Sequence, residues 1–544
     1  MSTDTRGPTG RTPAPPTPPG DGPPADDLLA AELVRGHGSP LYVYDLTRVE
    51  RAADDLRAAL PRGSRLYYSL KANPHPELVR TLRLAGCRPE ICSTGELAAA
   101  LAAGFDGADC LYGGPGKTAQ ELREALAAGV RTFSVESPAD LRRVGAEAVA
   151  HGVTVRCLLR VNGSGAGAGV GLRMTGGPSQ FGHDIADGLP SLDELTVEGT
   201  ELWGLHFFPL TNAADPQGLL EEAVASIRTA AALEAHWGRP LRMLDLGGGF
   251  ACPYAAPGER PRYDTLRAPL EAALDAHLPG WRQRLEPAFE SGRYLVGDSG
   301  RLICTVTEVK ESRGTVYGVL DSGINHLGGL SGVGRLPSLR AEPLRLTARG
   351  PAADPGPGGT RRVALVGPLC TPADVISRAT EAVPPHPGDL LAVPNVGAYG
   401  ATASLLGFLG RPAPAEITVR DGRVVSADRL ALVRTPLTVP PTPRPHRSPR
   451  EELNTVTTEH RPAERYENVL AELLPRLAEE RPLPAGRGLR DAGLDSMAVV
   501  ELLVRLEEAY DIAIPDDELG PEAFETVGSL WEVVARRLDP AAPH

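Results

Sequence analysis

Two residues of this chain stand where a covalent bond to another molecule could form. Lys71 ends the apolar run at residues 66–70, where partial burial can lower the pKa of an amine and allow a Schiff base with a carbonyl compound. Ser496 follows Asp495 and opens a run with apolar residues at helical spacing, where it could carry a flexible arm. The simpler alternatives are a solvated lysine and a serine that only caps a helix.

Two further segments bear on the chemistry of the lysine. Gly247, Gly248 and Gly249 follow a short apolar run, and the backbone N–H groups of such a loop can bind a phosphate; a tight strand-to-helix turn is the alternative. Glu290 and Arg293 lie in a Glu-Ser-Gly-Arg segment. The acid could keep a pyridine nitrogen protonated and the arginine could bind a phosphate, whereas alone the pair would be a surface ion pair.

The elements around these residues predict an α/β fold. From Leu41 to about Phe289, β-rich runs alternate with helical stretches, which is typical of a parallel sheet with helical crossovers. The number of units favours a TIM-type (β/α)8 barrel, in which functional residues lie at the C-terminal ends of the strands. After Glu290 the runs are β-branched and separated by Gly and Pro, which predicts a second, β-rich domain.

These segments and their order resemble the fold-type III pyridoxal-phosphate decarboxylases, the group that includes diaminopimelate and ornithine decarboxylases, over residues 38–437. The resemblance implies pyridoxal 5′-phosphate as a cofactor, a homodimer, and Lys71 as the Schiff-base lysine. It implies that further residues contact the cofactor, and these are Glu90, Arg160, His206, Phe208, Thr211, Gly247, Gly248, Gly249, Glu290, Arg293 and Tyr399.

Several of these residues have a role that the resemblance implies. Glu290 corresponds to the partner of the pyridine nitrogen, and the three glycines to the phosphate loop. Arg293 and Tyr399 correspond to further phosphate contacts, and Arg160 and Glu90 to residues beside the ring.

The segment at residues 204–212 departs from the pattern of the family. Its members often have two histidines here, one of which stacks on the pyridine ring, whereas this chain has His206 and then Phe208. A phenylalanine can pack against the ring but cannot donate a hydrogen bond. Thr211 is expected to keep a hydroxyl contact with the phosphate.

Cys370 is similar to the thiol that reaches across the dimer interface in this family and reprotonates the carbanion; a small buried hydrophobe is the alternative. Thr371 follows it, where relatives acting on free basic substrates often have an acid that binds a distal ammonium. The missing acid disfavours such substrates. Asp374 remains nearby, with an interface role expected at least as readily as substrate binding. The stretch from Gly367 to Asp374 looks more like the subgroup of the family that acts on carrier-bound amino acids.

The C-terminal module resembles an acyl or peptidyl carrier domain, with Ser496 as the attachment site of 4′-phosphopantetheine. An amino acid held through its side-chain carboxyl as a thioester keeps its α-groups free to reach a cofactor. Such a substrate has no charged tail, which agrees with Thr371. The small all-α bundle is expected to follow a Pro-rich linker that permits delivery in cis or across the dimer.

The sequence therefore favours a decarboxylase of a carrier-bound acidic amino acid (glutamyl, aspartyl or methylaspartyl) that gives an ω-aminoacyl thioester for a specialised metabolite. Its implied partners are a phosphopantetheinyl transferase, a loading ligase and a downstream acyltransferase or synthase. The alternatives are a free amino-acid decarboxylase or racemase with an appended carrier, and a scaffold without catalytic activity.

Composition limits the remaining classes. A net charge of −13 argues against a nucleic-acid partner, and the seven cysteines show no metal-binding or disulfide spacing. No apolar stretch is long enough to span a bilayer and no signal peptide is evident, so a cytoplasmic protein is expected. The expected domains are a disordered tail (1–26), the barrel (38–290), the β-rich domain (291–437), the linker (438–461) and the carrier (462–540).

Overall fold

The computed structural model describes residues 25–163, 172–173, 179–185, 188–327, 341–346 and 359–435, then 462–474 and parts of 477–538. The chain divides into two compact units, Met1–Thr435 and Pro436–His544. Residues 1–24 of the tail expected at 1–26 lie outside the described residues. The whole linker expected at 438–461 lies outside them too.

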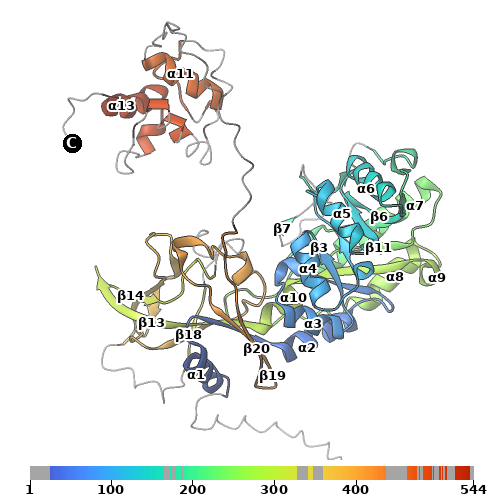
Figure 1. Ribbon diagram of the computed structural model, residues 1–544, viewed down its shortest axis with the longest axis horizontal. Helices are drawn as coiled ribbons and strands as arrows, with labels where there is room; N and C mark the ends of the chain where they lie inside the picture. Colours follow the sequence, from blue (N-terminus) through green and yellow to red (C-terminus); the bar gives the residue numbers. More distant parts are fainter. Residues whose placement is uncertain are drawn as a thin grey trace, which may run out of the picture. The chain divides into compact units, whose positions relative to one another are not determined.

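Eight parallel strands close into a barrel in the first unit (Figure 1). The ring closes because the fourth strand pairs with the fifth and the last pairs with the first. In ring order the strands are β2 (Arg65–Ser69), β3 (Arg88–Ile91), β4 (Leu111–Tyr112), β5 (Thr132–Val135), β6 (Val155–Asn162), β9 (Thr200–His206), β11 (Met243–Asp245) and β12 (Glu286–Ser291).

Helices lie outside the barrel strands in Figure 1. Most of them connect successive strands, whereas the first leads into the barrel and the last follows it. Their starts follow from the sequence, because the side chains of Ser93, Thr118 and Ser137 each accept a hydrogen bond from a backbone N–H in the first turn. The helices are α2 (Leu46–Ala59), α3 (Pro76–Leu84), α4 (Thr94–Ala102), α5 (Ala119–Ala127), α6 (Pro138–Ala150), α7 (Pro216–Trp237), α8 (Arg267–His277), α9 (Trp281–Arg284) and α10 (Arg293–Val296).

A nine-stranded sheet forms the rest of the first unit, and it includes a strand from the N-terminal side of the barrel. The barrel segment is expected to begin at residue 38, but β1 (Leu41–Asp45) pairs antiparallel with β13 and parallel with β19. Burial explains the difference, since Leu41 and Val43 pack with Ile303 and Ile417 in the core of this sheet. The other strands are β13 (Gly300–Ser312), β14 (Thr315–Leu320), β15 (Leu344–Arg345), β16 (Arg361–Val366), β17 (Val375–Ala382), β18 (Leu390–Val393), β19 (Ala415–Arg420) and β20 (Arg423–Arg429).

Short elements complete the described part of this unit. Helix α1 (Ala25–His37) precedes β1, and it begins two residues inside the tail expected at 1–26. Strand β8 (His183–Asp184) pairs with β6, and β7 (Leu172–Arg173) pairs with β10 (Leu210–Thr211). No described helix is both long and apolar enough to cross a membrane.

The second unit is helical where it is described. Helices α11 (Pro462–Leu473) and α13 (Val527–Leu538) and the 3-10 turn Pro521–Phe524 surround a separate apolar core that includes Tyr466, Leu502 and Leu530. Ser496 lies outside the described residues. The barrel, the β-rich sheet and the helical unit confirm the predicted fold class.

We expect Gly204→Ala to destabilise the barrel by about 3 kcal/mol, because overpacking against backbone cannot be relieved by a side-chain rotation. Gly204 lies on β9, and a Cβ there would stand 1.8 Å from the carbonyl oxygen of Met243 on β11. Chemical denaturation measures the change. Gly36→Ala is the control, since a Cβ at Gly36 meets nothing within 4 Å and alanine favours a helix. Equal stability of both variants would contradict the close approach of β9 and β11.

Candidate active site

Lys71 and Glu90 form an ion pair at the C-terminal ends of adjacent strands. Lys71 lies in a 3-10 turn directly after β2, and its Nζ is 3.4 Å from Oε2 of Glu90 on β3. The Lys71 side chain is 44 % exposed, whereas that of Glu90 is only 5 % exposed. The amine is therefore accessible to a ligand, while its carboxylate partner is held in the protein.

The expected lowering of the Lys71 pKa is wrong, because the neighbouring negative charge has the opposite effect. Desolvation lowers the pKa of the amine, but the negative charge of Glu90 and further contributions from Cys92, Glu290 and Tyr399 outweigh it, so the pKa is raised. Desolvation likewise raises the pKa of the Glu90 carboxyl, yet Lys71 and hydrogen bonds hold it below its usual range. One of these bonds comes from Cys92 Sγ, 3.1 Å from Oε1.

Lys71 is one of only three lysines among 56 lysines and arginines in the chain. Lys117 is fully buried and bonds to Asp140 and to the carbonyl oxygens of Gly114 and Ser134, so it is not free to react. Lys310 is exposed on β13, in the other sheet. Only Lys71 combines an accessible amine with the C-terminal end of a barrel strand.

A second polar cluster lies at the same end of the barrel, where ligand atoms of His206, Asp245 and Glu290 on three neighbouring strands lie within 4.8 Å of one another. Oε1 of Glu290 is 3.3 Å from Nε2 of His206, and these two atoms have no hydrogen-bond partner. Burial, with Glu90 and Asp245 adding to it, raises the pKa of Glu290 well above its usual range. Burial and nearby cations lower the pKa of His206 well below its usual range. The contact therefore joins two neutral groups and is not an ion pair.

His206 is held in place from its other ring nitrogen. Oγ of Ser134, at the end of β5, lies 2.7 Å from Nδ1 of His206. If the serine hydroxyl donates to Nδ1, the imidazole carries its proton on Nε2 and presents it to Glu290. Ser134 was not singled out by sequence, although its place at the end of a barrel strand is a signal that could have found it.

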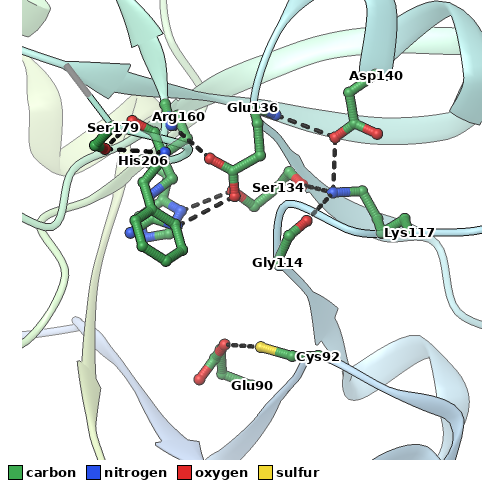
Figure 2. Close-up of polar contacts among 12 residues, drawn as sticks. Glu90, Cys92, Gly114, Lys117, Ser134, Glu136, Asp140, Arg160, Ser179 and His206 are labelled. Atoms are coloured by element: carbon green, nitrogen blue, oxygen red, sulfur yellow. Dashed lines mark hydrogen bonds and ion pairs between the residues drawn. The ribbon is translucent and has the colours of Figure 1, made fainter. Parts of the chain in front are cut away.

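Arg160 is fixed between an acid and aromatic rings. Its Nη1 is 3.1 Å from Oε1 of Glu136, a buried pair, and its guanidinium lies 4.6 Å from the ring centroid of Phe181. Glu136 also accepts a hydrogen bond from the backbone of Gly182. Figure 2 shows Glu136 reaching toward Arg160, with Lys117 and Asp140 beyond it.

Phe208 is, with His206, one of the two residues that the resemblance places beside the pyridine ring. The Nζ of Lys71 and the guanidinium of Arg160 each lie 5.9 Å from the centroid of its ring. Phe208 is thus close to both cations. The histidine of the segment, His206, instead bonds Ser134 and faces Glu290.

The glycine loop is built by close backbone packing. A Cβ at Gly247 would be 2.2 Å from the carbonyl oxygen of Phe207, and one at Gly248 would be 2.5 Å from that of Glu290. The N–H of Gly247 donates to Oδ1 of Asp245, a contact not foreseen from the sequence. Any phosphate bound by this loop would therefore meet the N–H groups of Gly248 and Gly249.

Arg293 and Tyr399 lie together on the Lys71 side of the barrel end. The Arg293 guanidinium is 5.0 Å from the ring centroid of Tyr399, whose backbone N–H donates to the carbonyl oxygen of Ala72. Gly292 packs as closely, since a Cβ there would be 2.7 Å from Ala72 Cβ. Tyr399 and the segment that carries Arg293 therefore both contact Ala72, the residue directly after Lys71.

Cys370 and Thr211 are not linked to Lys71 by a contact within the described chain. Cys370 is exposed, in a loop held by Asp374, whose buried carboxylate accepts hydrogen bonds from the N–H groups of Ile324 and Leu369. This bonding gives Asp374 a structural role, while its expected role at an interface or in substrate binding stays a prediction. Thr211 lies on β10, with its side chain partly buried.

These residues fit pyridoxal phosphate. Glu290 and His206 have unpaired polar atoms that a pyridine nitrogen can meet, and the adjacent glycine loop suits a phosphate. Lys71 supplies an amine for the carbonyl group. A protonated pyridine nitrogen would also be a cationic partner for the carboxylate of Glu290.

A family model described as the pyridoxal binding domain of pyridoxal-dependent decarboxylases matches residues 46–297, and one described as a phosphopantetheine attachment site matches residues 467–534. The chain is 30 % identical over 410 residues to the L-glutamyl-[BtrI acyl-carrier protein] decarboxylase of Niallia circulans, covering 73 % of this chain and 92 % of that one. The chain belongs to the fold-type III pyridoxal-phosphate decarboxylases. It is a pyridoxal-phosphate-dependent decarboxylase with a phosphopantetheine-bearing domain.

Other relatives of the decarboxylase act on different substrates. This chain is 29 % identical to the 2-[(L-alanin-3-ylcarbamoyl)methyl]-2-hydroxybutanedioate decarboxylase of Staphylococcus aureus. The match covers 70 % of this chain and 95 % of that one. The crystal structure of diaminopimelate decarboxylase from Helicobacter pylori complexed with L-lysine matches with a TM-score of 0.62 and 26 % identity, over 73 % of this chain and 95 % of that one.

The raised pKa of Glu290 predicts a pH dependence of the cofactor-free enzyme. An unfolded glutamate has a pKa of about 4.3, so above this pH folding takes up a proton and the free energy of unfolding falls as pH rises, by up to about 1.4 kcal/mol per pH unit. Glu290→Gln should remove this contribution and flatten the curve above about pH 5. Denaturant titrations across pH measure it.

The control for this experiment is Glu308→Gln, a change of the same kind at an exposed position on β13. It should leave the slope of the wild type unchanged. If the slope of Glu290→Gln also equals that of the wild type, Glu290 is ionised in the folded protein and the assignment is wrong.

Proposed function

We propose that this enzyme decarboxylates an acidic amino acid, glutamyl, aspartyl or methylaspartyl, that is held as a side-chain thioester on the phosphopantetheine arm of Ser496. The product is an ω-aminoacyl thioester for a specialised metabolite. The observation that carries the proposal is the presence of both modules in one chain, a decarboxylase barrel and a phosphopantetheine attachment domain.

Two further observations support a tethered substrate. The Niallia circulans relative is, by its name, a decarboxylase of a glutamyl group on an acyl-carrier protein. At residue 371 this chain has threonine after Cys370, where an acid would suit a free basic substrate. A thioester at the distal carboxyl removes the charge that such an acid would recognise.

The residues of the site have roles that follow from their geometry. Pyridoxal phosphate, when bound, accepts the electron pair left on the α-carbon as CO₂ departs. Lys71 holds the cofactor, since it is the accessible lysine beside Glu90. Glu290 holds the proton of the ring nitrogen, and His206 faces the carboxyl group of Glu290. Gly248, Gly249, Arg293, Tyr399 and Thr211 are proposed for the phosphate, and Phe208 and Arg160 for the flank of the ring.

Cys370 is proposed as the acid that returns a proton from Sγ to the α-carbon. It is exposed in this chain, on a loop that Asp374 holds rigidly, as expected of a thiol that serves the site of a second subunit. The enzyme is therefore proposed to be a homodimer with two shared sites. A phosphopantetheinyl transferase, a loading ligase and a downstream acyltransferase or synthase are its proposed partners.

Intact-protein mass spectrometry of the phosphopantetheinylated full chain tests the function directly. After glutamate, aspartate or methylaspartate has been loaded on Ser496, the wild type should lose the mass of one CO₂. Lys71→Ala should keep its loaded mass, whereas Lys310→Ala, at an exposed lysine outside the site, should react as the wild type does. A Ser496→Ala protein that decarboxylates the free amino acid at the wild-type rate would instead establish a free amino-acid decarboxylase with an appended carrier.

Mixing two inactive variants tests the shared site. Lys71→Ala and Cys370→Ala each disable a different half, so an equal mixture that exchanges subunits should recover about a quarter of the wild-type activity, because half of its dimers contain one intact site. Size-exclusion chromatography before and after mixing verifies the dimer. No recovery from exchanged dimers would mean that Lys71 and Cys370 act in the same subunit. Wild-type activity of Cys370→Ala alone would mean that Cys370 has no role.

A further inference from the structure

Lys117 is a buried lysine that the chemistry of the site does not use. The side chains of Lys117 and Asp140 are 0 % and 3 % exposed, and the Nζ of the lysine lies 2.7 Å from Oδ2 of the aspartate. Replacing such a buried ion pair by packed apolar residues often leaves the stability of a protein unchanged, because removing both charges from water is costly. The further contacts of the pair therefore indicate its role.

The pair holds two consecutive peptide groups at the C-terminal end of β5. Nζ of Lys117 donates to the carbonyl oxygen of Ser134, 2.9 Å away. Oδ2 of Asp140, in the first turn of α6, accepts from the backbone N–H of Glu136 at 3.1 Å. The two peptide groups flank Val135, the last residue of the strand. Figure 2 shows Lys117 and Asp140 making these contacts side by side.

Lys117 holds this backbone just beyond the point where strand pairing ends. Strand β4 is two residues long, and its pairing with β5 ends at Tyr112 and Phe133. Nζ of Lys117 also donates to the carbonyl oxygen of Gly114, two residues after β4, at 2.7 Å. One amine thus joins the segment that leaves β4 to the end of β5.

The residues on either side of Val135 direct their side chains to the cofactor site. Oγ of Ser134 is 2.7 Å from Nδ1 of His206, and Oε1 of Glu136 is 3.1 Å from Nη1 of Arg160. Ser134 and Glu136 are two residues apart, the spacing at which side chains of an extended chain lie on the same side. A shift of the backbone at the end of β5 would therefore move both contacts together.

Lys117 also favours the neutral form of His206. Burial lowers the pKa of this imidazole, and the charges of Arg160, Lys71 and Lys117 lower it further. A neutral imidazole carries one proton, and a serine hydroxyl that donates to Nδ1 leaves this proton on Nε2. Nε2 is the atom that lies 3.3 Å from Oε1 of Glu290.

We propose that Lys117 is a positioning residue of the decarboxylase. With Asp140 it fixes the end of β5, which keeps the hydroxyl of Ser134 bonded to Nδ1 of His206. The imidazole then presents its Nε2 proton to Glu290. This role rests on the proposed contact of Glu290 with the ring nitrogen, and it does not depend on which substrate is decarboxylated.

The tautomer of His206 tests the proposal in the cofactor-free, full-length protein. Long-range ¹H–¹⁵N NMR spectra of a chain with ¹⁵N-labelled histidine distinguish the two tautomers, and His206→Gln identifies the signals. The test variant is Lys117→Met with Asp140→Asn, which removes the ion pair without leaving a buried charge. The wild type should carry its proton on Nε2 alone, whereas the test variant and Ser134→Ala should each show a mixture of tautomers.

Arg284→Met with Glu234→Gln is the matched control. It removes an ion pair between α9 and α7 whose carboxylate likewise accepts a backbone N–H, that of Leu241. This variant should keep the wild-type tautomer, and circular dichroism verifies that the variants are folded. A wild-type tautomer in the test variant would overturn the proposal. So would a proton on Nδ1 in the wild type, an outcome that needs no variant.

The affinity for pyridoxal phosphate tests whether Lys117 acts through Ser134. The Kd of the cofactor, from an absorption titration, should rise about tenfold in the test variant, and Ser134→Ala alone should raise it too. Adding Ser134→Ala to the test variant should raise the Kd no further, because the changes break one chain of contacts. An additive loss, or an unchanged Kd with a lower free energy of unfolding, would overturn the proposal. Neither measurement uses a substrate, so neither bears on the tethered substrate.

Discussion

The burial of three carboxyl groups at one end of a barrel is the constraint on which the site depends. Glu90, Asp245 and Glu290 come from three strands and are nearly inaccessible to solvent. Lys71 neutralises Glu90, while burial raises the pKa of Asp245 to about 7 and that of Glu290 well above its usual range. Burying a carboxylate without a cation is costly, so Glu290 ionises only when a cation lies beside it. A pyridine nitrogen that carries a proton supplies this cation.

Closure of the barrel makes this arrangement possible. Lys71, Glu90, Ser134, Arg160 and His206 each stand at or just beyond the C-terminal end of a different strand, and the ring of parallel strands brings these ends together. Each side chain then needs a local partner to keep its orientation. Ser134 holds His206, and Glu136 holds Arg160, through contacts between strands far apart in the sequence.

The strand order, the fold class and the cluster around Lys71 could be predicted because local motifs occur in a fixed order along the chain. The contacts of Asp245, Ser134 and Glu136 could not be predicted, since they arise only when the barrel closes. The raised pKa of Lys71 also depends on Glu90, nineteen residues away. Strand β1 could not be assigned to the second sheet by sequence, because its apolar pattern suits either core.

The most direct test of the account is the protonation state of the bound cofactor. The ¹⁵N NMR shift of pyridoxal phosphate labelled at the ring nitrogen reports whether that atom carries a proton. We expect the shift of a pyridinium nitrogen in the wild type and that of an unprotonated nitrogen in Glu290→Gln. An unprotonated ring nitrogen in the wild type would contradict the account, because Glu290 would then have no cation to meet.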